Sequence, residues 1–592
     1  MIVPMKKVTI LSLADHRDES LNALRELGVL HVSPLRSAPA GDLETARRHL
    51  EEAQAVLVVL RRLAAENPGA PSPAGPISPA EVLAEALRLT AAIRERAETL
   101  LRLNDRVKHL APYGDFDPAE LRELIARGIS IRLFRAESRA DIQLPEGAVR
   151  VDLHRDNTAV FFALLNAPGW TGNAVEMPVP ERALGDVRRE RTQVEADQAA
   201  DGKALAQLAS RLNLAEKAAA DALDRVRWLE ARNGMGQDGA VLLIQGFMPA
   251  PDLPTLQAEA KRQGWGWLAE DPTEADAVPT LIRYSRWTRP IQSLMDMLGI
   301  VPGYWELDVS PVFLIFFSLF FAMLVGDAVY GLLFLGLTFL IRKKWKAAPP
   351  SLVPLLTILS LSTMVWGVLS GSYLGIEALP GPLRKLKLDM LTDTTRIEHI
   401  CFLLGASQMS LAHAWCIVRN PRSITALAQL GWIGSCWMMY SLAENLILGK
   451  PHLPGIFWIF GVSVFLIFAF TVPFKKFKTD YQSLLNVPFS IIGHFGDTIS
   501  YLRLYLVASS SVVLIKAFNE IAFGGDAPMT LGRGLAGAVI IFLVHLLNIL
   551  LSALSVLVHG VRLNALEFSS HLGIQWLGRH FNPFRKESAP TP

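Results

Sequence analysis

Two arginines lie inside long apolar stretches near the C-terminus. Arg503 is part of SYLRLYLV, and Arg562 is part of VHGVRLNALE. A guanidinium at membrane depth is costly and stays charged, so a protein keeps one there only where it faces a polar path or a counter-charge. Two such arginines indicate the handling of ions. The alternative is that both side chains snorkel from helix ends, which the mostly apolar residues beside each arginine disfavour.

Polar residues recur at helical spacing along the same two stretches. In the last stretch they follow steps of three or four residues, at His545, Asn548, Ser552, Ser555, His559 and Arg562. Asp497 and Ser500 lie at the same spacing ahead of Arg503. Residues at this spacing share one face of a helix. A single serine would be uninformative, because its hydroxyl can bond its own backbone. The whole stripe, ending in arginine, predicts a water-lined path.

The chain has two parts of different composition. Of its 592 residues, 51% are hydrophobic, which is too many for an average soluble protein. Charged residues are common in residues 1–305, whereas long apolar runs dominate residues 306–592. The net charge of +2, without a stripe of lysine and arginine, excludes nucleic acid as a partner. The three cysteines all lie in apolar segments, which excludes a disulfide scaffold, a zinc site and a redox pair. No metal and no cofactor is expected.

Residues 1–305 predict an elongated cytoplasmic arm of α/β lobes joined by a helical coiled-coil hairpin. The opening KKVTILSL alternates like a strand rather than a signal peptide, so this part is expected in the cytoplasm. A helix in DESLNALRELGVL and a strand in HVSPL complete a first lobe. Apolar residues recur at steps of three and four from Leu43 to Leu60 and from Leu205 to Leu229, which is typical of a coiled coil.

The rest of the arm completes this picture. A second helix is predicted over 79–110, and the segments ISIRLFRA, AVRVDLHRD and TAVFFALLN predict three strands. VLLIQGFMPA marks the return to the first lobe. The arm has no nucleotide-binding, serine-hydrolase or zinc-protease motif, so we expect it to bind partners without catalysis.

Residues 306–592 predict an all-α membrane domain with about eight transmembrane helices, because this count places the strongly basic short loops in the cytoplasm. Residues 309–341 would form a hairpin, and spans follow near 351–375, 398–418, 425–447 and 455–473. The basic groups are residues 342–346, Arg419 with Arg422, and residues 475–478; the loop PLRKLKLD is an exception. The last two helices, 484–523 and 535–572, exceed a hydrocarbon layer of about 30 Å and must tilt. The C-terminus is then cytoplasmic.

Four segments of this half match the motifs of one known family. FFAMLVGDAVYG (320–331) is similar to the pattern FFGxxxGDxGYG, and VWGVLSGSYLG (365–375) is similar to FWGxxxGSYFG. SYLRLYLV and VHGVRLNALEF are similar to two arginine motifs. Together they resemble the membrane stator subunit of rotary V/A-type ATPases, called subunit I in bacteria and archaea and subunit a in eukaryotes. The resemblance covers essentially the whole chain.

The resemblance implies a non-catalytic, multi-pass subunit of a rotary ATPase in the cell membrane, translocating H⁺ or Na⁺. Its arm would grip the peripheral stalk subunits and the adaptor between central stalk and ring, and so act on the catalytic head indirectly. Its tilted helices would lie in the lipid bilayer against a ring of proteolipid subunits, each with an essential carboxylate.

The resemblance also implies roles for single residues. Arg503 and Arg562 would stabilise the ionised ring carboxylate and, because a guanidinium does not release its proton, separate two aqueous half-channels. Glu567 would belong to the inner half-channel. The outer half-channel would be lined by His545, Asn548, Ser552 and His559. Asp497, in the stripe that leads to Arg503, is a further candidate for the ion path.

The chain departs from the family at several positions. Ser552 stands where many relatives have an acidic residue, and Ser511 stands where some have a histidine, so the identity of the outer proton carriers is open. His413 and Glu444 are expected to be packing or interface polar groups. Asp327 is expected to be structural, capping the turn of a broken helix.

Two other classes of function remain as alternatives. A polytopic membrane sensor or scaffold with a coiled-coil signalling arm would explain the arm and the spans, but it would not require two intramembrane arginines. A secondary transporter predicts an internal repeat of the spans, and the sequence shows none.

Overall fold

The computed structural model describes the chain except residues 37–40, 68–75, 139, 141, 346–347, 376–380, 392, 473–481, 524–529 and 587–592. Its contacts divide the chain into two compact units. Unit 1 comprises Met1–Val8, Phe247–Glu259 and Leu268–Pro583, and unit 2 comprises Thr9–Gly246, Ala260–Trp267 and Phe584–Pro592. The domain boundary predicted at residue 305 stays a prediction. The basic residues 475–478 lie outside the described residues.

The start of the chain forms the predicted strand, helix and strand. These are β1 (Met5–Leu13), α1 (Arg17–Leu27) and β2 (His31–Ser33). Later segments add β7 (Gly236–Asp238), β8 (Val241–Pro249), α7 (Leu253–Gln263) and β9 (Gly266–Glu270). The strands form one sheet in the order β2-β8-β1-β9, with β7 paired to β8. Leu21 and Leu24 of α1 are fully buried, as the apolar spacing of this helix predicts.

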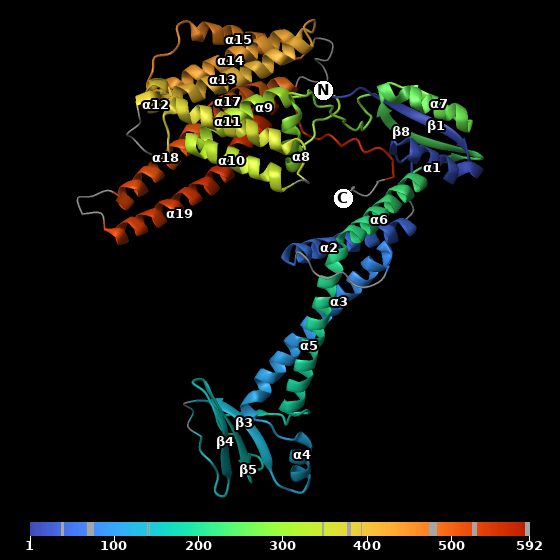
Figure 1. The fold of residues 1–592 in the computed structure, drawn as a ribbon, viewed down its shortest axis with the longest axis vertical. Helices are drawn as coiled ribbons and strands as arrows, with labels where there is room; N and C mark the ends of the chain where they lie inside the picture. The colour runs from blue at the N-terminus through green and yellow to red at the C-terminus, as the bar shows by residue number, and fades with distance from the viewer. Residues whose placement is uncertain are drawn as a thin grey trace. The chain divides into compact units, whose positions relative to one another are not determined.

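Long helices make up most of unit 2. They are α2 (Asp42–Glu66), α3 (Pro79–Leu110), α5 (Leu184–Leu208) and α6 (Leu212–Asn233), and α3 lies along α5 as α2 lies along α6 (Figure 1). Their shared core includes Leu57, Leu60, Leu205 and Leu208, all at predicted seam positions. The predicted coiled-coil segment from Leu205 to Leu229 is interrupted at η3 (Ala209–Arg211), and just after it Asn213 Oδ1 accepts a hydrogen bond from the Leu214 N–H. Such local side-chain bonds compete with helical ones.

A second sheet forms from the predicted strand-rich stretch. It contains β3 (Ile131–Glu137), β4 (Val149–Arg155), β5 (Ala159–Leu165) and β6 (Val175–Met177), in the order β4-β5-β3-β6 and antiparallel where they pair. The short helix α4 (Pro118–Ala126) precedes it. Phe134 stacks on Phe162 with ring centroids 5.6 Å apart, which fills one face of the sheet.

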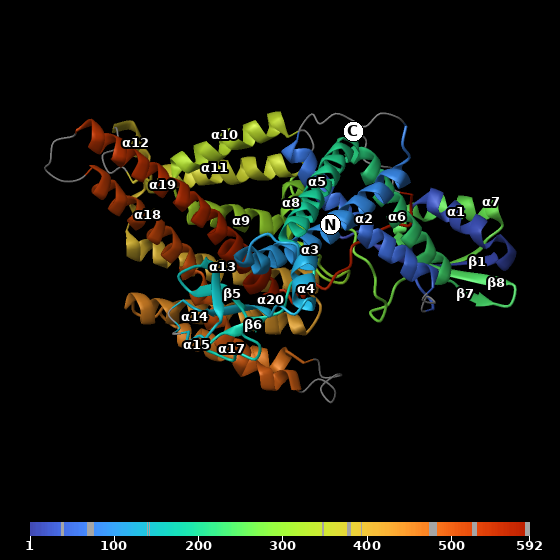
Figure 2. The same cartoon turned by 90° about the horizontal axis from the view of Figure 1, so that it is seen from below.

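Unit 1 contains the apolar helices. In chain order they are α8 (Gln292–Leu298), α9 (Ser310–Val325), α10 (Ala328–Lys344), α11 (Leu352–Ser370), α12 (Gly381–Leu386), α13 (Thr394–Arg419), α14 (Thr425–Leu448) and α15 (Ile456–Phe470). They are followed by α17 (Gln482–Ser500), α18 (Leu502–Phe523), α19 (Leu531–Ser555), η8 (Val556–Gly560), η9 (Leu563–Phe568) and α20 (Ser569–His571). Figures 1 and 2 both show α10 beside α11 and α18 beside α19.

The structure determines the number of membrane spans only in part. Among the described residues, four helices are long and apolar enough to cross a membrane: Leu352–Ser370, Thr394–Arg419, Leu484–Ala522 and Gly534–His571. The pair α9 and α10 qualifies only jointly, and its two axes are bent by 120° at the break. The helix α15 is shorter. The prediction of eight spans is therefore not confirmed, although helices exist in every predicted segment.

Asp327 forms the turn between α9 and α10. Its Oδ1 accepts hydrogen bonds from the backbone N–H of Val329 and Tyr330, and its Oδ2 accepts from the Leu374 N–H at 2.6 Å. The side chain therefore caps α10 and ties this turn to the end of α11. The prediction that Asp327 is a structural cap is confirmed.

Gly367 allows α11 to approach this turn. A Cβ atom at Gly367 would lie 2.1 Å from the Ala328 backbone nitrogen, so the two glycine-containing motifs interlock through their backbones. Gly461 in α15 has open space around it: no atom of the described residues lies within 4 Å of a Cβ placed there.

These two glycines give a matched test of the fold. Gly367→Ala should lower the free energy of unfolding by about 1–3 kcal/mol through overpacking. Gly461→Ala should be neutral or stabilise by about 0.5–1 kcal/mol, because alanine is the better helix former. Thermal unfolding of the purified chain in detergent compares them, and equal melting temperatures would contradict the interlocked turn.

Candidate functional site

The two predicted arginines meet at one buried carboxylate. Glu567 is 4% exposed, and its Oε1 lies 3.2 Å from Arg562 Nε and 3.7 Å from Arg503 Nη2. The arginine side chains are 25% exposed for Arg503 and 51% exposed for Arg562. Neither carboxylate oxygen has a hydrogen bond of good geometry within the described residues. The group is thus an ion-paired triad with unused acceptor capacity and an accessible cationic side.

The local backbone explains why Arg562 and Glu567 face each other. They are five positions apart, which in an α-helix of 3.6 residues per turn would point them about 140° apart. Here η8 and η9 are π-helical and flank Arg562. A π-helix bonds residue i to i+5 and brings positions five apart onto one face. Such turns are rare and are frequently found at functional sites. No pattern in the sequence indicates these π-helical turns.

A buried hydrogen-bond network fixes the two arginine segments relative to each other. Tyr501, fully buried between α17 and α18, donates from its hydroxyl to Gln408 Oε1 at 2.8 Å. Gln408 Nε2 of α13 donates to Asn564 Oδ1 of η9 at 3.0 Å. Each end of this network lies two residues from an arginine. Tyr501 and Asn564 stand inside the motifs, but nothing in the sequence pointed to Gln408.

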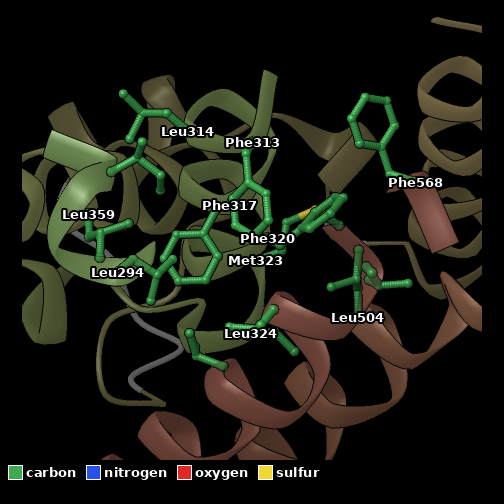
Figure 3. Packing of buried hydrophobic residues seen from close by; sticks show 14 of the residues in the cluster. Leu294, Phe313, Leu314, Phe317, Phe320, Met323, Leu324, Leu359, Leu504 and Phe568 are labelled. Carbon is green, nitrogen blue, oxygen red and sulfur yellow. The ribbon is translucent and has the colours of Figure 1, made fainter. Parts of the chain in front are cut away.

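Apolar side chains of α9 pack against both segments. Phe313, Phe317 and Phe320 belong to one buried cluster with Leu504, next to Arg503, and Phe568, next to Glu567. Figure 3 shows labelled side chains of α9 together with Leu504 and Phe568 as members of this cluster. Both arginine segments are therefore anchored in an apolar core, while the side chains of Arg503 and Arg562 stay partly exposed.

The predicted polar stripe lies on one face of α19, and this face is buried. Asn548 and Ser552 are each 1% exposed, whereas Leu546, Leu550 and Leu554 are exposed. The Tyr330 hydroxyl of α10 contacts His545 Nδ1 at 2.7 Å and accepts from Asn548 Nδ2 at 3.2 Å. Along this polar stripe, three buried atoms have no hydrogen-bond partner within the described residues: Asn548 Oδ1, Ser552 Oγ and His559 Nδ1. Unpaired buried polar atoms are rare and favour a place for water.

Asp497 lies in a different group. Its Oδ2 is 3.1 Å from His571 Nε2, and His571 also contacts His413. Glu444 forms ion pairs with His399 and with Lys450. The structure thus brings together Arg503, Arg562 and Glu567 at one point. It places His545, Asn548, Ser552 and His559 along one face and Asp497 in a histidine cluster.

Comparison with known proteins finds relatives along the whole chain. It is 30% identical over 634 residues to V-type ATP synthase subunit I 1 of Treponema pallidum, covering 99% of this chain and 100% of the relative. The V-type ATP synthase subunit I of Borreliella burgdorferi is 27% identical, at 99% and 100% coverage. The A-type ATP synthase subunit I of Pyrococcus abyssi is 26% identical over 58% of this chain and 53% of the relative.

Two further comparisons add little. No family model matches the chain. A solved structure, the cytoplasmic N-terminal domain of subunit I, homolog of subunit a, of V-ATPase, is matched at 15% identity over 45% of this chain and 100% of that one. Its TM-score of 0.19 is too low to establish a shared fold.

The Tyr501 network can be tested by removing one hydroxyl. Tyr501→Phe leaves Gln408 Oε1 buried without its donor, which should lower the free energy of unfolding by about 1–3 kcal/mol. Tyr505→Phe is the control, because within the described residues its hydroxyl makes no hydrogen bond. Thermal unfolding in detergent measures both variants. An unchanged melting temperature for Tyr501→Phe would show that this network does not stabilise the fold.

Proposed function

Because the chain belongs to the family of V-type and A-type ATP synthase subunit I, the non-catalytic membrane subunit of a rotary ATPase, we propose that its membrane helices couple H⁺ or Na⁺ movement to rotation of a proteolipid ring. As a stator subunit it associates with other subunits of that complex. The observation that carries the proposal is the buried Glu567 carboxylate between two partly exposed arginines.

The arginines act as fixed cations. A guanidinium holds its charge at any working pH and cannot pass a proton along. It therefore attracts the ionised carboxylate of each passing ring subunit and stops ions from crossing directly between two half-channels. The partial exposure of both arginine side chains leaves room for that second carboxylate. Ions then cross only by riding the ring.

The half-channels lie on either side of the arginines. Glu567 serves the inner one, because its oxygens are buried beside the arginines and retain acceptor capacity. His545, Asn548, Ser552 and His559 serve the outer one, supported by their common face and by the unpaired atoms on it. Asp497 lies in the histidine cluster, and we assign it to the cytoplasmic approach to Glu567.

The remaining proposals concern partners and orientation. The arm binds the peripheral stalks and the adaptor between central stalk and ring, and reaches the catalytic head only through them. The membrane part spans the cell membrane eight times, with the arm and the C-terminus in the cytoplasm. The alternative of a membrane sensor loses support, since relatives matched over their full length are ATP synthase subunits.

Arg503→Gln tests the proposed function. ATP-driven ion uptake by vesicles containing the assembled complex should fall at least about 100-fold, because the fixed charge is lost while a shorter polar side chain remains. Arg396→Gln is the control: this arginine, at the start of α13, is exposed and lies 3.4 Å from Asp393. Near-normal uptake by an assembled Arg503→Gln complex would defeat the proposal.

Single cysteines test the orientation. Cysteines at Lys344 and Thr530, in a chain lacking Cys401, Cys416 and Cys436, should react with an impermeant thiol reagent from opposite sides of the membrane. Both positions are exposed in the structure, so the reagent can reach them. Reaction from the same side would exclude the eight-span arrangement.

A further inference from the structure

Three histidines from distant parts of the sequence meet inside unit 1. They are His413 of α13, His494 of α17 and His571 of α20. His413 is 4% exposed, His494 is 6% exposed, and the His571 side chain is 4% exposed. One ring nitrogen of each lies within 4.8 Å of those of the other two. Three imidazoles converging at this distance form a candidate set of metal ligands.

Two neighbouring side chains fix which ring nitrogen carries the hydrogen in two of the three histidines, His413 and His571. The Gln429 amide oxygen lies 2.6 Å from His413 Nδ1, so that Nδ1 donates. The Asp497 carboxylate lies 3.1 Å from His571 Nε2, so that Nε2 donates. In proteins, metal-binding histidines typically donate their second nitrogen to such oxygens, which orients the ring and raises its basicity.

The remaining nitrogens then face each other as lone pairs. His413 Nε2 and His571 Nδ1 are 3.2 Å apart. In the neutral rings neither atom has a hydrogen to donate, so the contact is repulsive unless a positive charge lies at the junction. A tetrahedral zinc ion with Zn–N bonds of about 2.0–2.1 Å holds its nitrogens about 3.3 Å apart. The observed 3.2 Å agrees with two ligands of one ion, and it equally fits a single proton shared between the two rings.

We propose that His413, His494 and His571 bind a divalent transition metal ion, with Zn²⁺ as the expected occupant. Imidazole nitrogen suits Zn²⁺, Cu²⁺ and Ni²⁺, whereas Mg²⁺ and Ca²⁺ prefer oxygen ligands. Gln429 and Asp497 are positioning residues that act through the rings. The count of cysteines predicted no zinc site, and histidines at such long sequence spacing match no short metal-binding motif.

A cavity lies beside the cluster. A cavity of about 220 Å³ is lined by residues that include Cys416, Arg419, Gln429 and Leu572. Gln429 contacts His413, and Leu572 follows His571 in the sequence, so the cavity is adjacent to two of the three proposed ligands. Once bound, the ion would link α13, α17 and α20. It would thereby stabilise the folded chain and the end of the segment that carries Arg562.

Metal binding by the full chain tests the proposal. The purified chain in detergent, stripped with a chelator and given Zn²⁺, should retain one ion per chain and unfold at a higher temperature than the stripped chain. His413→Gln and His571→Gln should each weaken Zn²⁺ binding at least about tenfold. His452→Gln is the control, since this histidine contacts Ser441 and lies outside the cluster.

X-ray absorption of the Zn²⁺-loaded wild-type chain keeps the test decisive if a variant fails to fold. It should show a shell of imidazole nitrogens at about 2.0 Å. A sulfur shell at about 2.3 Å would assign the ion to cysteine and overturn the proposal, as Cys436 Sγ lies 3.7 Å from His494 Nδ1. Failure of the folded wild-type chain to retain Zn²⁺ would also overturn the proposal. The short contact between His413 and His571 would then be explained by a proton that the two rings share. Unchanged affinity in folded variants would exclude these ligands. The test does not depend on ion transport.

Discussion

The Glu567 carboxylate joins the two helical segments whose positions matter most. An ionised carboxylate buried without partners would cost several kcal/mol, so Glu567 must stay within reach of Arg503 and Arg562. This constraint accounts for the π-helical turns around Arg562, which bring Glu567 onto the same face. It also gives a reason for the Tyr501, Gln408 and Asn564 network, which holds the same segments in register. The ion pairs, the π-helical turns and the hydrogen-bond network therefore all hold Glu567 close to the two arginines.

The triad is closed on one side and open on the other. Aromatic residues of α9 cover its back, where Leu504 and Phe568 are fully buried (Figure 3). A dry, low-dielectric wall strengthens the field of the two guanidinium groups toward the exposed side. A partner carboxylate that arrives there meets fixed cations with little reorganisation. In this way a subunit without catalytic residues can control where an ion is held.

Periodic features were predictable from the sequence, and contacts between distant residues were not. The two arginines, the stripe on α19 and the seams of α2 and α6 follow from helical spacing alone. Gln408 was missed because its meaning depends on Tyr501 and Asn564, which lie far away in the sequence. The histidine cluster was missed for the same reason. The span count depends partly on whether α9 and α10, bent by 120°, cross the membrane once or twice, and partly on whether shorter helices such as α15 cross it; hydropathy reports only that these helices are apolar.

The most direct test of this account is a structure of the intact complex at a resolution that shows side chains. In that structure we expect a carboxylate of the ring within about 4 Å of the guanidinium of Arg503 or Arg562, which is the range of an ion pair. Glu567 should remain buried behind the arginines. If every ring carboxylate lies far from both arginines, and the arginines contact only lipid or residues of their own chain, then the triad is structural and the ions follow another path.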